Sequence, residues 1–144
     1  MTNGNVKVIF DTNVWISFLI GKRLAIIKGY ISNGRLQIVT TDQLLLELRT
    51  VTSRKKLKRY FPTESVNALI ELLETIAQHF EIEPTHLISR DLKDNFLLDL
   101  IDISKADFLV TGDKDLLEIH SFKTAEILTP TECETQLKSI SPGR

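Results

Sequence analysis

The sequence predicts an α/β protein: a three-layer α/β/α sandwich around a central, mostly parallel sheet of about four to five strands. Two observations support this prediction. Short apolar runs that suit buried strands alternate along the chain with stretches whose apolar residues recur every three or four positions. The 144 residues, 42% hydrophobic and 26% charged, suffice for one packed core. We therefore expect a single domain over residues 1–138 and a flexible tail over 139–144.

The first half of the chain predicts two strands and three helices. Each strand is a short apolar run, and each helix has apolar residues at helical spacing. In chain order they are a strand at Val8–Phe10, helices at Val14–Ile20 and Leu24–Ile31, a strand at Leu36–Val39 and a helix from Asp42 to about Ser53. Asn33-Gly34 is a common pair at a helix end, and Thr41 is a favourable N-cap.

The second half continues the alternation. Thr63 is a suitable cap for the longest predicted helix, Asp91 caps the next, and Thr129–Glu132 is a capping box with proline at the first helical position. The expected elements are a helix from Glu64 to about His79, a short edge strand at Glu81-Ile82, a helix from Leu92 to about Ser104, strands at Phe108–Val110 and Ala125–Leu128, and a short C-terminal helix.

Composition excludes several classes of protein. The 18 basic and 19 acidic residues give a net charge of −1, so the protein has no overall basic surface to attract nucleic acid, and any such binding needs a local basic patch. The single cysteine, Cys133, excludes an internal disulfide framework, and the three histidines lack zinc-ligand spacing. No apolar stretch is long enough to span a bilayer, and the start of the chain has no export signal pattern. We expect a cytoplasmic protein that makes no use of a membrane.

Four acids are predicted to meet at one edge of the sheet. Asp11 and Asp113 follow strands that we expect to be parallel, and ligands bind at the carboxyl ends of such strands. Glu47 borders the buried face of its predicted helix, and Asp94 lies on the inward face of its own. Converging carboxylates repel unless a cation neutralises them, and hard oxygen ligands favour Mg²⁺ or Mn²⁺.

Each of these acids also has a simpler structural interpretation. An acid after a strand is often a turn residue or a cap, and Asp94 in a first helical turn complements the helix dipole. Asp91 fits a cap better than a ligand. Asp99 and Asp102 fall outside the apolar arc of the same helix, so we expect both to be solvated.

Three segments resemble the motifs of PIN-domain ribonucleases. Val8–Asn13 is similar to the opening strand and first acid of that family, Ser89–Leu97 to the helix of the third acid, and Ala106–Leu117 to the fourth-acid motif. The resemblance covers roughly residues 6–130. It is closest to the toxin components of bacterial toxin–antitoxin systems (VapC-like), although Leu92 stands where that subgroup often has proline.

The resemblance implies a metal-dependent endoribonuclease that uses Mg²⁺ or Mn²⁺ and leaves a 5′-phosphate and a 3′-hydroxyl. It also implies an RNA substrate, an antitoxin protein as partner, and a homodimer. The implied catalytic acids are Asp11, Glu47, Asp94 and Asp113. Of these, Asp11, Asp94 and Asp113 are the implied metal ligands, and Glu47 and Asp115 are further candidate ligands. The residues implied to orient the carboxylates are Thr12, Asn13 and Thr111.

One stretch of the chain is strongly basic. It holds six basic residues and no acid, and it precedes Tyr60-Phe61; its members are Arg49, Arg54, Lys55, Lys56, Lys58 and Arg59. Such a stretch suits an RNA backbone with a base stacked on the aromatic ring, or else it is a solvated helix end. Arg90 and Lys114 are near the predicted acids in sequence and are candidate contacts for the scissile phosphate.

Two other functions were weighed against a nuclease. The first is an RNA-binding or regulatory module of the same fold that has lost cleavage, which the full set of acids disfavours. The second is a phosphatase of the haloacid dehalogenase type, which needs an acid where Asn13 stands and another at Leu116 or Leu117. The nuclease is the expectation that the residues favour.

Overall fold

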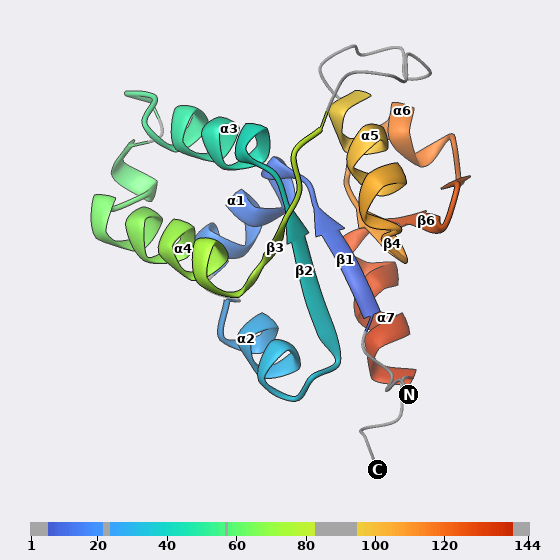
Figure 1. Cartoon of the computed structure of the whole chain (residues 1–144). Coiled ribbons are helices and arrows are strands. Elements are labelled where there is room, and N and C mark those ends of the chain that lie inside the picture. Colours follow the sequence, from blue (N-terminus) through green and yellow to red (C-terminus); the bar gives the residue numbers. More distant parts are fainter. Residues whose placement is uncertain (1–5, 22–23, 57, 83–94, 140–144) are drawn as a thin grey trace.

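The computed structural model describes residues 6–21, 24–56, 58–82 and 95–139, and Figure 1 shows their arrangement. A central sheet is flanked by helices on both faces, which confirms the predicted α/β architecture. Among the described residues the strands are β1 (Val6–Phe10), β2 (Leu36–Thr40), β3 (Gln78–His79), β4 (Phe108–Val110), β5 (Ser121–Phe122) and β6 (Ala125–Leu128). The helices are α1 (Thr12–Ile20), α2 (Leu24–Ser32), α3 (Asp42–Thr52), α4 (Thr63–Ile76), α5 (Asn95–Ser104), α6 (Lys114–Leu117) and α7 (Pro130–Ser139), with a 3-10 turn at Lys58–Tyr60.

The sheet has the strand order β3-β2-β1-β4-β6-β5, which is six strands in the described part of the chain against the four to five expected. All neighbouring strands are parallel except β5, a two-residue strand antiparallel to β6. The central strands β1, β2 and β4 stop level with one another, because Val8 pairs with Ile38 and Phe10 with Val110. Whatever follows these strands therefore gathers at one edge.

The two ends of α4 differ from the prediction. Pro62 occupies the cap position and Thr63 is already helical, so Thr63 is not the cap. The helix stops at Ile76, whose carbonyl accepts a hydrogen bond from the Gln37 side chain (3.2 Å), and Ala77 is extended. The chain then pairs with β2 at Gln78–His79, so the edge strand expected at Glu81-Ile82 was misplaced by three residues.

Three other helix starts show which residues cap the helices. Asp11 caps α1 by accepting a hydrogen bond from the Val14 amide (3.0 Å), so the helix begins at Thr12, two residues earlier than predicted. Thr41 holds the N-cap position of α3 but makes no capping bond through its side chain. The capping box of α7 is confirmed, because Thr129 and Glu132 exchange hydrogen bonds of 2.9 and 3.1 Å.

Burial on α5 corrects another expectation. Residues 96–101 are all buried, and Asp99 is only 4% exposed, so the prediction that Asp99 is solvated was wrong. A helical-wheel prediction assumes a single buried face, so it gives the wrong exposure for a helix that is enclosed on nearly every side. Asp102 is partly exposed as expected. The predicted caps and acids at Asp91 and Asp94 lie outside the described residues, as do residues 140–144 of the predicted tail.

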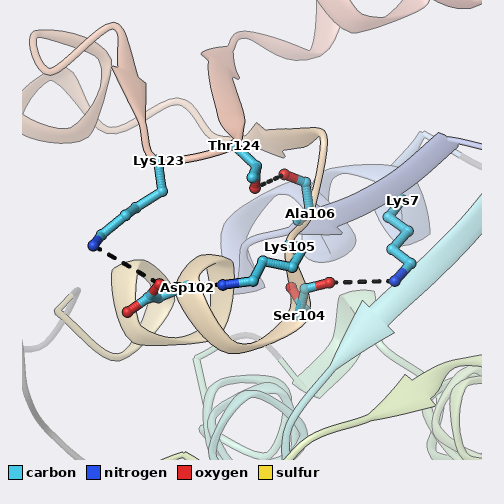
Figure 2. A network of polar contacts seen from close by, with 7 residues as sticks. All are labelled: Lys7, Asp102, Ser104, Lys105, Ala106, Lys123 and Thr124. Atoms are coloured by element: carbon cyan, nitrogen blue, oxygen red, sulfur yellow. Dashed lines mark hydrogen bonds and ion pairs between the residues drawn. The ribbon is translucent and has the colours of Figure 1, made fainter.

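Polar contacts hold the edge of the sheet opposite Asp11, as Figure 2 shows. Asp102 on α5 forms ion pairs with Lys105 (3.8 Å) and with Lys123 between β5 and β6 (3.9 Å). Lys7 on β1 donates to the Ser104 carbonyl (3.3 Å), and Thr124 donates to the Ala106 carbonyl (2.7 Å). These contacts set the place of α5 and β4 relative to β1. No helix within the described ranges is long and apolar enough to cross a membrane.

Candidate functional site

Asp11 lies at the centre of the level strand ends. It follows β1, its amide donates to the Val110 carbonyl of β4 (3.1 Å), and its side chain is 7% exposed. One carboxylate oxygen accepts from the Val14 amide and the other from the Thr111 hydroxyl. The backbone of Asn13 donates a further hydrogen bond to this carboxylate. Because the two oxygens together offer about four acceptor positions, one position remains available for a ligand.

Thr111 connects Asp11 and Asp113, two of the four acids that were predicted to converge. It follows β4, is fully buried, and donates its hydroxyl proton to Asp11. The same hydroxyl oxygen accepts the Asp113 amide (3.0 Å), and Asp113 in turn accepts the Asp115 amide (2.9 Å) as the cap of α6. This chain of hydrogen bonds, buried at Asp11 and part-buried at Asp113, orders the backbone that carries Asp113 against Asp11.

Glu47 on α3 contacts the residue that follows Asp11. The Thr12 hydroxyl donates to a Glu47 carboxylate oxygen at 2.9 Å, across the contact between α1 and α3. Glu47 is half-buried, whereas Asp42 and Arg49 on the same helix are exposed, which confirms the predicted orientation of the helix. The residue next to Asp11 therefore holds a third acid near the sheet edge.

Burial makes the Asp11 carboxylate costly to ionise. Desolvation raises the pKa of Asp11 above its ordinary value of 3.8, and the nearby charge of Asp113 raises it further. Hydrogen bonds from Thr111 and from the backbone of Val14 and Asn13 favour the charged form without offsetting the burial. A divalent cation beside these oxygens would reverse this balance.

The remaining predicted site residues are placed as follows. Asn13 and Lys114 are exposed next to Asp11 and Asp113, and Asp115 is half-buried on α6. Asp94 and Arg90 lie outside the described residues. Within the described part of the chain, no three His, Cys, Asp or Glu side chains form a group that could hold a metal ion. The described acids alone therefore do not form a metal site.

Arg49 of the basic stretch lies on α3, and the other members follow the C-terminal end of this helix, which points away from the sheet (Figure 1). Arg54, Lys55, Lys56 and Arg59 are exposed, and the side chain of Lys58 is outside the described set. The Arg59 guanidinium is 4.9 Å from the centre of the Tyr60 ring and donates to its hydroxyl (2.9 Å). Tyr60 is 51% exposed, so the ring is available to a stacked partner.

Sequence reasoning missed a hollow of about 550 Å³ beside the site. It is lined by the start of α3 and by β3 with the residues that follow it: Thr41, Asp42, Gln43, His79, Phe80, Glu81 and Ile82. His79 is exposed at the surface of this hollow. The parallel strands predicted from the sequence could have indicated this hollow, because Thr41 follows β2 just as Asp11 follows β1 and so lies at the same edge of the sheet.

Comparison with known proteins gives a family and a fold. A family model described as "PIN domain" matches residues 7–115. The crystal structure of PAE2754 from Pyrobaculum aerophilum is similar, with a TM-score of 0.55 and 16% sequence identity over 94% of this chain and 97% of that chain. At this identity the likeness concerns the fold alone. Among the curated proteins, none matches the chain.

Proposed function

The chain belongs to the PIN domain family, and on that premise we propose that it is a metal-dependent endoribonuclease. PIN domains are generally nucleases. The observation that carries the proposal is the pair of acids joined through Thr111 at the level ends of β1 and β4. This edge is where parallel sheets bind their ligands.

The donor set suits a divalent cation. All of the candidate ligands are carboxylate oxygens, which hard ions such as Mg²⁺ and Mn²⁺ prefer. The buried Asp11 carboxylate accepts from Thr111 and from the backbone of Val14 and Asn13, which leaves one of its about four acceptor positions for a cation. We assign Asp11, Asp94 and Asp113 as ligands, with Glu47 and Asp115 as further acids. A cation held there would neutralise phosphate charge and activate water for attack on phosphorus.

The protein's own groups prepare this edge for the reaction. Thr111 orients Asp11 and the backbone of Asp113, while Thr12 orients Glu47. Asn13 lies beside them as an exposed polar side chain. Lys114, exposed next to Asp113, and Arg90 supply positive charge for the scissile phosphate.

RNA is the proposed substrate because of the basic stretch. Its exposed cations, Arg54, Lys55, Lys56 and Arg59, with Lys58, would follow the phosphate backbone, and Tyr60 offers a stacking surface for an unpaired base. From Glu47 to the end of α3 at Thr52 the helix advances about 8 Å, a reach of one or two nucleotides, and the exposed cations follow directly. A single strand can thus contact both places.

The direct test is cleavage of a labelled single-stranded RNA in Mg²⁺ or Mn²⁺, with EDTA as the blank. Asp113→Asn should slow cleavage by at least about a hundredfold, because loss of even an orienting partner costs about 10–100-fold. Asp107→Asn is the matched control: this acid is at the opposite end of β4, where it accepts the Lys7 amide (2.9 Å). Equal cleavage by both variants, or none by the wild type, would contradict the proposal.

We also propose that the chain is the toxin of a toxin–antitoxin pair and forms a homodimer. Ile20 on α1 and Ile26 on α2 are exposed, and Ile26 lines a small apolar cavity of about 60 Å³. Induction in bacteria should stop growth for the wild type and not for Asp113→Asn, and co-expression of an adjacent antitoxin gene should restore it. Sedimentation equilibrium measures the dimer. Normal growth on induction would reject the toxin role.

A further inference from the structure

The hollow beside the acids has the size and place of a nucleotide subsite. Its volume of about 550 Å³ lies within the range of about 300–1,000 Å³ found for ligand pockets. The pairing of Val8 with Ile38 places Thr41 at the same level as Asp11, each directly after the end of its strand. His79 pairs with Thr40 on the other side of β2. The hollow therefore begins one strand away from Asp11.

The lining of the hollow disfavours phosphate and favours a base. Its charged side chains are Asp42 and Glu81, which repel anions. Phe80 and Ile82 supply an apolar surface, and unpaired RNA bases are recognised by stacking on aromatic side chains. The basic stretch at the other end of α3 is better suited to bind phosphates, because its cations are exposed there.

The polar groups of the lining indicate which bases fit. Carboxylates such as those of Asp42 and Glu81 accept hydrogen bonds from exocyclic amino groups, and a glutamine amide pairs in bidentate fashion with adenine. Within the part of the chain that the structure describes, the Gln43 side chain has no hydrogen-bond partner. Adenine, cytosine and guanine carry an exocyclic amino group, and uracil does not.

We propose that this hollow holds one unpaired base of the RNA substrate next to the cleaved bond and selects an amino-bearing base over uracil. The inference rests on the proposed nuclease function and adds a specificity site to it. Phe80 supplies the stacking surface, Gln43 pairs with the base edge, and the carboxylates of Asp42 and Glu81 accept its amino group.

The first test measures binding without cleavage. Fluorescence anisotropy in EDTA compares short labelled oligoadenylate, oligocytidylate and oligouridylate, and the wild type should bind the first two at least about fivefold more tightly than the third. Gln43→Ala should bring the adenylate ratio close to one, and Asp42→Asn with Glu81→Gln should bring both ratios close to one. Gln78→Ala is the control, since this exposed side chain on β3 does not line the hollow. Circular dichroism checks that each variant is folded.

The second test sequences the ends produced from a random RNA pool in Mg²⁺ or Mn²⁺. Uracil should be depleted at one position beside the cut for the wild type and Gln78→Ala, and restored there for Asp42→Asn with Glu81→Gln. Equal affinity of the wild type for the three oligonucleotides, or ratios unchanged by Gln43→Ala, would overturn the base subsite. If the wild type discriminates among the oligonucleotides but cuts no RNA, the nuclease proposal fails and the base subsite stands.

Discussion

At the scale of single residues, the site depends on two threonines that carry no charge. Thr111 spans from Asp11 to the backbone of Asp113, and Thr12 holds Glu47. Charged ligands close to one another repel, so their positions must be held by neutral groups that donate to them. The sequence predicted both threonines in this orienting role from the family resemblance. Their hydrogen bonds in the structure are the reason to expect an effect when either is replaced.

Thr111→Val removes the hydroxyl and keeps the shape of the side chain. We expect cleavage to fall by about 10–100-fold, because Asp11 loses a donor that orients it. The unfolding free energy should fall by about 1–3 kcal/mol, because the Asp113 amide loses its acceptor. Thr124→Val is the matched control: it removes a hydrogen bond at the opposite edge of the sheet and should leave the cleavage rate unchanged. Similar cleavage rates for the two variants would argue against an orienting role.

Asp11 should reduce the stability of the metal-free protein at neutral pH. The native pKa is raised above the unfolded value of 3.8, so the native state holds a proton that the unfolded chain has already released. Stability of the wild type therefore falls as pH rises through the native pKa. Asp11→Asn cannot titrate, so in EDTA its melting temperature should exceed that of the wild type at pH 7, and the gain should vanish below pH 3.8. Thermal unfolding over a pH series measures this, and a gain that persists in acid would contradict it.

At the scale of elements, local sequence patterns predicted the buried apolar strands and missed the strands that form only through backbone pairing with a neighbour. The strands β1, β2, β4 and β6 are buried apolar runs, and each was predicted. By contrast, β3 consists of exposed Gln78 and His79, whose side chains carry no strand pattern. The backbone of β2 makes it a strand, since the Phe80 amide donates to the Thr40 carbonyl (3.1 Å). Likewise β5 exists only as a partner of β6.

The candidate site divides in the same way. That Asp11 and Asp113 share an edge followed from parallel strands alone, and the orientation of Glu47 followed from helical spacing. The hollow beside Thr41 depends on where the chain after α4 returns to β2, a tertiary fact that composition does not encode. Asp94 lies outside the described residues, so its role stays a prediction.

The end of α5 gives a prediction about stability. Lys105 follows the helix with φ of 59°, a left-handed conformation that costs a residue with a Cβ about 1–2 kcal/mol. Its amide donates to the Ile101 carbonyl (2.8 Å), as is usual at a helix end. Lys105→Gly should therefore raise the unfolding free energy by about 1 kcal/mol, as measured by denaturant titration. Lys105→Ala keeps the strain and loses the same exposed ion pair with Asp102, so it should bring no gain.

At the scale of the whole molecule, the net charge of −1 conceals two opposed surfaces. Acids lie at the level strand ends, and exposed cations lie beyond the other end of α3, which runs between them (Figure 1). A polyanion would meet attraction at one place and repulsion at the other. A bound cation removes the repulsion, so metal binding and RNA binding should support each other.

That coupling begins with the effect of the cation on the folded protein alone. Mg²⁺ or Mn²⁺ that binds only the native state should stabilise it by about 2.7 kcal/mol at a hundred times the dissociation constant. For a chain of this size this corresponds to a rise in melting temperature of about 5–10 °C. Asp11→Asn should reduce the rise strongly, whereas Asp107→Asn, whose side chain lies at the opposite edge, should leave it intact. Scanning calorimetry over a series of metal concentrations measures the effect. Equal, non-saturating shifts in the wild type and both variants would indicate charge screening without a site, and the carboxylate assignment would then fail.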